Sequence, residues 1–252
     1  MTDSIVPASG RFQALELRTT NLAAAAAFYG RVLGMRVEGQ GDDARLVRDG
    51  GPCSFLSLLP EAARLRGAPP HWLGHLGVDD VARASEAFVR AGAERLGPVR
   101  TVGGTAAVGL RDPGGAPFAV RSRIEATSAA PAAWHELHTT DLAQMFAFYS
   151  DHLGWSRGGT IDLGPELGVY QRFAFAAGEL DAGGMVASAG KRGTSPHWEF
   201  YFATPDLDRA LDAVRSLGGN VHQGPHRVPS GDLIAACHDA QGAAFGLLQH
   251  RA

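Results

Sequence analysis

The side chains best able to do chemistry fall into two groups, each set in short runs that alternate apolar and polar residues. Because alternate residues of a strand face the same side, each group can gather on one face of a sheet. There the side chains would bind a small molecule or hold a displaced metal ion; the alternative is that they are hydrogen-bonded residues of a sheet wall. The predicted ligand-binding residues are Glu16, His75, Trp134, Glu136, Trp198, Glu199 and Tyr201.

The carboxylates in these groups need partners. Glu16 could share one face with His75, and Glu136 could share a second face with Glu199 and Tyr201. A buried carboxylate without a hydrogen-bonding or charged partner costs several kcal/mol or becomes protonated. We therefore expect Glu16 and Glu136 to lie beside such partners or beside solvent.

An internal repeat shows which elements must position these residues. The segment from Leu15 to Leu22 matches the segment from His135 to Leu142 without a gap, and Pro70-His71-Trp72 matches Pro196-His197-Trp198. The chain is therefore a tandem duplication. We predict a first domain at residues 10–123, a small and polar linker at 124–131 and a second domain at 132–250.

Each half repeats again, more weakly, which gives four modules. Every module begins with a short strand-like run that ends at a residue suited to cap a helix, and a run of helical periodicity follows. Short runs separated by turn residues then predict about three further strands. The fold class is thus α+β, with four βαβββ modules at about 12–59, 71–122, 132–188 and 197–249. The capping residues are Asn21, Asp80, Asp141 and Asp206.

Two strings of residues resemble a known family. The first runs from Trp134 to Asp141 and continues with Phe148-Tyr149 and Leu153-Gly154-Trp155; the second runs from Tyr201 to Asp208. Both resemble modules of the vicinal oxygen chelate superfamily, which includes glyoxalases, bleomycin-resistance proteins and extradiol dioxygenases. The resemblance implies two glyoxalase-like domains, each with a curved mixed sheet, helices outside and a concave face that takes a small molecule.

The resemblance also implies where a metal ion would bind. Family members carry the metal ligands on the first and last strands of modules. The first-strand positions hold Ala14, Leu73, Trp134 and Glu199, and the last-strand positions hold Ala119 and Gly246. A catalytic metal needs about three protein ligands and an open position, so one glutamate does not suffice. We therefore expect no family-type metal site and no cofactor, with a displaced divalent metal as the alternative.

The resulting hypothesis is a protein that binds a small, partly apolar molecule, as bleomycin-resistance relatives do. Trp134 at a lost ligand position would fill or line the concave face, which suggests an apolar or aromatic ligand or else a closed cavity. The alternative is a metal-dependent lyase or dioxygenase of the glyoxalase or extradiol type. The two halves can pair within one chain, which predicts a monomer, although a homodimer stays open.

Composition excludes other classes of partner. The formal net charge is -3 over 252 residues, with no basic cluster of the kind that binds nucleic acid. No run of apolar residues is long enough for a transmembrane helix, and the first residues do not resemble a secretory signal. Cys53 and Cys237 form no disulfide framework, so we expect a cytoplasmic protein.

Overall fold

The computed structural model describes residues 10–40, 44–48, 54–102, 104–123, 132–191 and 194–251. The predicted linker and Cys53 lie outside these residues, and the domain limits stay a prediction. The chain forms two compact units. Unit 1 combines the second and third modules and unit 2 combines the first and fourth. Unit 1 comprises Met1–Gln13, Gly74–Thr127 and Trp134–Trp198, and unit 2 comprises Ala14–Leu73, Ser128–Ala133 and Glu199–Ala252.

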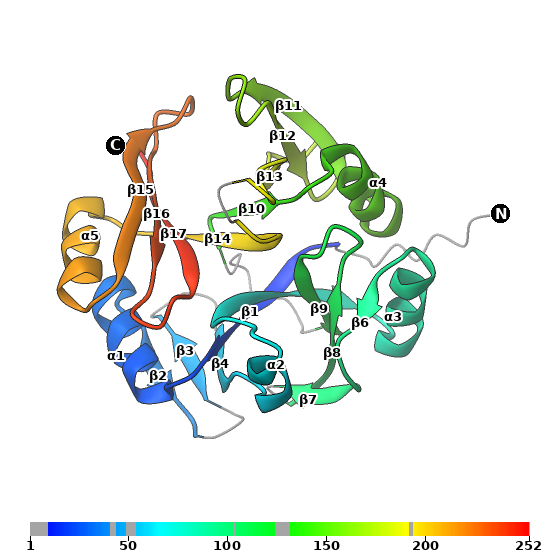
Figure 1. The fold of residues 1–252 in the computed structure, drawn as a ribbon, viewed down its shortest axis with the longest axis horizontal. Helices are drawn as coiled ribbons and strands as arrows, with labels where there is room; N and C mark the ends of the chain where they lie inside the picture. The colour runs from blue at the N-terminus through cyan, green and yellow to red at the C-terminus, as the bar shows by residue number, and fades with distance from the viewer. Residues whose placement is uncertain are drawn as a thin grey trace. The chain divides into compact units, whose positions relative to one another are not determined.

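The described residues form two mixed sheets, which confirms the predicted α+β class (Figure 1). The nine-stranded first sheet has the order β2-β3-β4-β1-β5-β9-β8-β6, and β7 pairs with β8. The first strands of its modules, β1 and β5, pair in parallel with β4 and β9. Its strands are β1 (Phe12–Thr19), β2 (Arg36–Glu38), β3 (Arg45–Val47), β4 (Ser54–Leu58), β5 (His71–Val78), β6 (Glu94–Arg95), β7 (Arg100–Val102), β8 (Thr105–Arg111) and β9 (Pro117–Ser122).

The eight-stranded second sheet repeats this arrangement with the order β11-β12-β13-β10-β14-β17-β16-β15. Here β10 and β14 are the first strands of their modules, and they pair in parallel with β13 and β17. Its strands are β10 (Trp134–His138), β11 (Ser156–Asp162), β12 (Val169–Ala174), β13 (Gly183–Val186), β14 (His197–Ala203), β15 (Asn220–Arg227), β16 (Leu233–His238) and β17 (Ala244–Gln249).

Each of the four predicted helices is present and begins after its predicted capping residue. The side chains of Asn21, Asp80, Asp141 and Asp206 each accept a hydrogen bond from a backbone N–H of the first turn. The helices pack on strands of their own modules, as α5 does along β15 in Figure 1. The helices are α1 (Leu22–Leu33), the short α2 (Glu61–Leu65), α3 (Val81–Arg90), α4 (Leu142–Leu153) and α5 (Leu207–Ser216).

In unit 1, three buried side chains form a chain of hydrogen bonds. The indole N–H of Trp198 donates to the hydroxyl of Tyr149 at 3.1 Å, and this hydroxyl donates to Asp112 at 2.9 Å. A second carboxylate oxygen of Asp112 accepts from the backbone N–H of Ala116, which closes the hairpin between β8 and β9. Burial raises the pKa of both Tyr149 and Asp112.

Unit 2 contains a matching chain of hydrogen bonds, formed by the residues that correspond to these three in the internal repeat. Trp72 donates to Tyr29 at 3.0 Å, and Tyr29 donates to Asp239 at 3.1 Å. Asp239 in turn accepts from backbone N–H groups of the hairpin between β16 and β17. The Phe-Tyr motif of each first helix therefore ties a strand start to a hairpin.

None of the described helices is long and apolar enough to cross a membrane.

Candidate functional site

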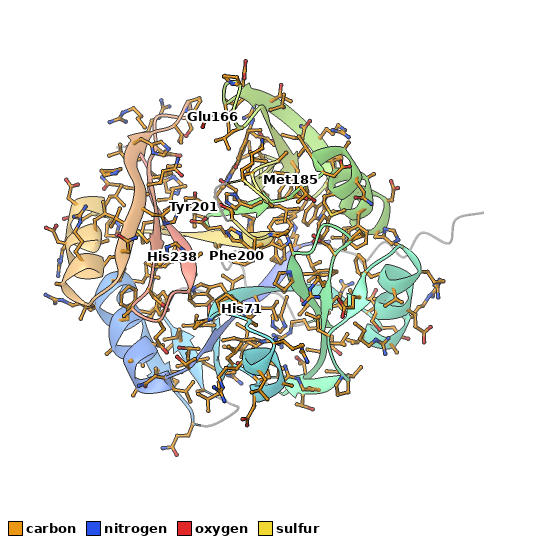
Figure 2. All side chains as sticks on the ribbon, viewed as in Figure 1. His71, Glu166, Met185, Phe200, Tyr201 and His238 are labelled. Atoms are coloured by element: carbon orange, nitrogen blue, oxygen red, sulfur yellow. The ribbon has the colours of Figure 1, made fainter. Side chains whose placement is uncertain are left out.

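The strands β10 and β14 each place their side chains on two opposite faces of the second sheet. On one face, Trp198 and Phe200 of β14 and His135 of β10 are buried in an aromatic core. Figure 2 labels Phe200 and its neighbour Tyr201, which leave β14 on opposite sides. We call the other face the polar face; its residues are Trp134, Glu136, His138, His197, Glu199 and Tyr201.

A line of hydrogen bonds, with one close contact between a carboxylate and an imidazole, runs along the polar face within unit 1. The indole N–H of Trp134 donates to the Tyr170 hydroxyl at 2.7 Å, and this hydroxyl donates to a carboxylate oxygen of Glu136 at 3.1 Å. The other Glu136 oxygen lies 3.2 Å from Nε2 of His138, whose Nδ1 lies 2.7 Å from the Ser188 hydroxyl. The side chains of Glu136 and His138 are 15% and 16% exposed, so neither is fully buried.

Two tyrosine rings of this region lie directly against glycines of adjacent strands. A Cβ atom at Gly246 would lie 2.2 Å from Cδ1 of Tyr201, and one at Gly184 would lie 2.0 Å from Cε1 of Tyr170. Two carbon atoms that are not bonded to each other cannot lie this close, so glycine is required at both positions for the rings to lie where they do. Tyr201 pairs in register with Gly246, and its ring therefore covers the sheet at that position.

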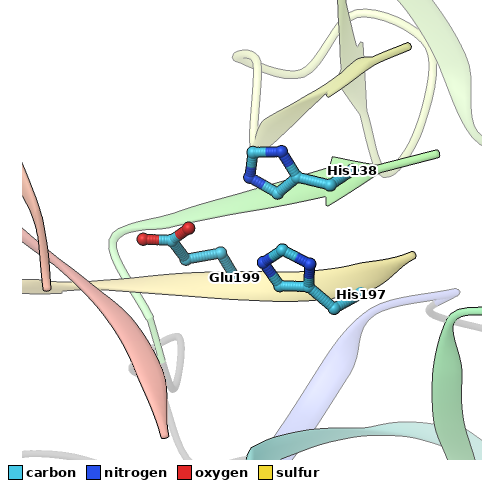
Figure 3. Close-up of side chains that lie close together, drawn as sticks. All are labelled: His138, His197 and Glu199. Carbon is cyan, nitrogen blue, oxygen red and sulfur yellow. The ribbon is translucent and has the colours of Figure 1, made fainter. Parts of the chain in front are cut away.

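Across the described part of the chain, three side chains of the polar face come close enough to share a metal ion. One ligand atom from each of His138, His197 and Glu199 lies within 4.8 Å of the other two (Figure 3). Glu199 follows His197 by two residues on the continuous strand β14, which puts both on the same face. Two imidazoles and a carboxylate are the donor types that zinc and iron(II) use.

The orientation of the rings does not fit a shared ion. The rings of His138 and His197 are stacked, with centroids 4.5 Å apart and planes only 10° from parallel. A metal lies in the plane of an imidazole that binds it, along the nitrogen lone pair. Two nearly parallel rings in van der Waals contact, with planes about 3.5 Å apart, share no such point. One ring would have to rotate to bind the same ion as the other. Nδ1 of His138 contacts the Ser188 hydroxyl and Nδ1 of His197 contacts the backbone oxygen of Ser195, and both contacts oppose such a rotation.

The first half carries a different set at the matching positions, all in unit 2. Glu16 matches Glu136, but Arg18 takes the place of His138 and Leu73 the place of Glu199. The Glu16 carboxylate accepts two hydrogen bonds, from the guanidinium of Arg18 at 3.1 Å and from the Ser57 hydroxyl at 2.6 Å. The partners predicted for Glu16 are therefore present, as are those predicted for Glu136.

His71 is the first-half counterpart of His197. Burial lowers the pKa of His71, and the nearby charge of Arg18 lowers it further, whereas the Pro69 carbonyl and Glu16 act in the opposite direction. The neutral imidazole is thus favoured beside a guanidinium that already supplies the positive charge.

Comparison with known proteins decides the family. The model of the Glyoxalase/Bleomycin resistance protein/Dioxygenase superfamily matches residues 11–120 and 132–247. The chain belongs to this superfamily. Within it, "Putative glyoxylase CFP32" of Mycobacterium tuberculosis is 28% identical over 252 residues, which covers 93% of each chain. "Anthracycline biosynthesis protein DnrV" of Streptomyces peucetius is 29% identical over 132 residues, which covers 46% of this chain and 45% of that protein.

Solved structures of the superfamily share the fold. Homoprotocatechuate 2,3-dioxygenase from Arthrobacter globiformis superposes with a TM-score of 0.69 at 18% identity, covering 98% of this chain and 82% of that chain. The Mn(II)-bound glyoxalase from Novosphingobium aromaticivorans superposes with a TM-score of 0.65 at 15% identity, covering 97% and 83%. At these identities the likeness concerns the fold alone.

The structure brings together only part of the predicted set of site residues. Trp134, Glu136, Glu199 and Tyr201 lie on the polar face, whereas Trp198 leaves β14 on the opposite side and is 3% exposed in the aromatic core. Glu16 and His75 are buried on β1 and β5 and belong to different compact units.

Sequence reasoning missed four side chains of this region: His138, His197, Tyr170 and Ser188. The spacing of two residues from Glu136 and from Glu199 was the signal for the two histidines. No sequence signal identified Tyr170 or Ser188, since their contacts depend on how β12 and the segment after β13 lie beside β10.

Proposed function

We propose that the polar face of the second sheet binds a small, partly apolar molecule without the metal ion that other superfamily members use. The observation that carries this proposal is the line from Trp134 through Tyr170 and Glu136 to His138. It joins two aromatic rings, which contribute apolar contact area, to a carboxylate and an imidazole, which fix the orientation of a polar group.

The positions of the superfamily's metal ligands support the metal-free form of the proposal. The last-strand positions hold Ala119, which pairs with His75, and Gly246, which pairs with Tyr201. Neither alanine nor glycine has a side chain that can bind a metal. Glu199 is the one first-strand position with a carboxylate. The stacked rings of His138 and His197 do not complete a set around it.

The test is a screen of small aromatic molecules by ligand-observed NMR, with the wild type beside a Trp134→Phe variant. The variant keeps most of the apolar area but removes the indole N–H that holds Tyr170, so ligands of the wild type should bind about tenfold more weakly. The control variant is His226→Gln, at an exposed position of β15, which should leave binding unchanged. Trp155→Phe would not serve as a control, because Trp155 packs in the core. Equal binding to the wild type and Trp134→Phe would contradict the proposed site.

A second candidate is a metal-dependent lyase or dioxygenase, which the convergence of His138, His197 and Glu199 favours. Bound there, a divalent metal would polarise oxygen atoms of a substrate. Metal content is measured on protein purified without chelators and without a metal-affinity tag. We expect almost none; about one metal per chain, lost in Glu199→Gln, would establish the second candidate instead.

A further inference from the structure

Arg18 is a buried arginine of β1 whose hydrogen bonds are incomplete. Its side chain is 9% exposed, and one Nη nitrogen donates to Glu16 at 3.1 Å. Its Nε is buried and has no hydrogen-bond partner in the described part of the chain. A guanidinium has five N–H donors and stays charged, so burying an unpaired donor costs free energy. A ligand that accepts from this guanidinium would remove that cost.

The neighbouring carboxylate does not complete the hydrogen bonds of Arg18. One oxygen of Glu16 accepts from Arg18, and the other accepts from the Ser57 hydroxyl at 2.6 Å. A single hydrogen bond therefore joins the guanidinium to Glu16, in place of the two parallel bonds that a carboxylate can accept from an arginine. The guanidinium keeps N–H groups for a second acceptor.

Ser57 and His71 lie beside Arg18 and are partly exposed. Ser57 pairs in register with Arg18, so both side chains lie on one face of the first sheet. Burial lowers the pKa of His71, and the nearby charge of Arg18 lowers it further, which favours a neutral ring. We call Arg18, Ser57 and His71 the Arg18 site; all three belong to unit 2, and Arg18 carries the charge of the site.

The charges on this face of the first sheet favour an anion as the second acceptor. The register of β2, β3, β4 and β1 puts one row of residues across the sheet: Glu38, Arg45, Phe55 and Glu16. Arg36 lies on the same face as Glu38 and pairs with it at 3.0 Å. With Arg18, these residues include three arginines and two glutamates, so their formal charge is positive.

We propose that the Arg18 site binds the carboxylate group of a small acid, whose oxygens accept from the guanidinium N–H groups that Glu16 leaves. An acid with one negative charge matches the excess of one arginine over the glutamates, whereas a doubly charged phosphate would exceed it. Phe55 and Leu73 lie two residues from Ser57 and His71, on the same face, and are buried, which suits an apolar body. This proposal goes beyond the proposed function, since it concerns the first half of the chain and uses no residue of the polar face.

The test compares butyrate, butyramide and butylamine, which differ in charge but little in size. Their affinities are measured by ligand-observed NMR at pH 7 and one ionic strength, with EDTA present to remove metal. We expect butyrate to bind about tenfold more tightly than butyramide, because hydrogen bonds between charged groups are stronger than those to a neutral amide, and butylamine not to bind. Equal affinities of butyrate and butyramide, or no binding of butyrate, would overturn the inference.

Two variants assign the binding to Arg18. Arg18→Lys keeps the charge beside Glu16 but loses the planar pair of donors, so butyrate should bind about tenfold more weakly. His71→Glu supplies a carboxylate from within the chain, which should pair with Arg18 and exclude butyrate. Arg90→Lys, at an exposed position of α3, is the matched control and should bind butyrate as the wild type does. Undiminished binding of butyrate to either variant, shown to be folded by its melting transition, would refute the assigned position.

Inorganic phosphate is the last probe of the test. We expect phosphate at the concentration of butyrate to leave butyrate bound to the wild-type protein. Phosphate that displaces butyrate at equal concentration would assign the Arg18 site to a doubly charged anion and overturn the carboxylate.

Discussion

The substitution His135→Leu should remove a large part of the protein's sensitivity to acid. His135 lies on β10 between Trp134 and Glu136 but faces the core, where it is 2% exposed and stacks on Phe12 with ring centroids 5.1 Å apart. Its Nδ1–H donates to the carbonyl oxygen of Ala182 at 2.8 Å. Burial lowers the pKa of His135 to about 4, because a charged imidazolium would lose its hydration there.

The magnitude follows from proton linkage. An unfolded chain binds a proton at this imidazole near pH 6.5, whereas the folded chain binds it only near 4. The unfolded state therefore binds more protons between these values, and the free energy of unfolding falls as the pH falls through this window. At about 1.4 kcal/mol for each pH unit, the shift from 6.5 to about 4 gives a total loss of about 3.4 kcal/mol, of which about 2.5 kcal/mol is reached at about pH 4.5.

Leucine is a suitable replacement because Leu15 occupies the matching position of the first half and is fully buried. Urea unfolding of both proteins at pH 7.5 and at pH 4.5 gives the two free-energy differences, and carboxylates titrate alike in both proteins. We expect the wild type to lose about 2.5 kcal/mol more than His135→Leu between these conditions. The same loss in both proteins would refute a buried, neutral His135, and His226→Leu at an exposed position controls for the loss of one imidazole.

Two further predictions concern the core. Tyr149→Phe should lower the free energy of unfolding by about 1–3 kcal/mol in urea titrations, because it leaves the Asp112 carboxylate and the Trp198 indole without the hydroxyl between them; an unchanged value would contradict a role for this hydroxyl in stability. Burial raises the pKa of the Cys237 thiol to about 12, so in a Cys53→Ser background a thiol reagent at pH 8 should label the native protein far more slowly than the protein in denaturant. Equal rates would show that Cys237 is accessible.

Those elements that depend on local sequence were predictable. Asn21 and Asp141 cap the helices that their side chains indicated, and Gly34 and Gly154 end these helices with left-handed backbone. Such features need only a few neighbouring residues. The internal repeat then extended each local prediction from one half of the chain to the other.

The composition of the polar face was only partly predictable. Alternation along β14 separates Glu199 from Trp198, and this rule alone shows that both cannot face the same ligand. The contact of Tyr170 with Glu136 depends instead on β12 lying beyond β13 from β10, and the pairing of strands distant in sequence is not encoded in any short motif. Side-chain rotation adds the stacking of His138 on His197, which residue type and spacing do not determine.

The duplication itself separates the residues required by the fold from those available for function. Tryptophan, tyrosine and aspartate recur in both buried chains of hydrogen bonds, since each copy must tie its strand start to a hairpin. The residues that differ between the copies include Arg18 against His138 and Leu73 against Glu199. These changes lie at positions that form or match the polar face, and they alter the charge there. The two halves therefore share one fold but carry different charges at matching positions of their strands.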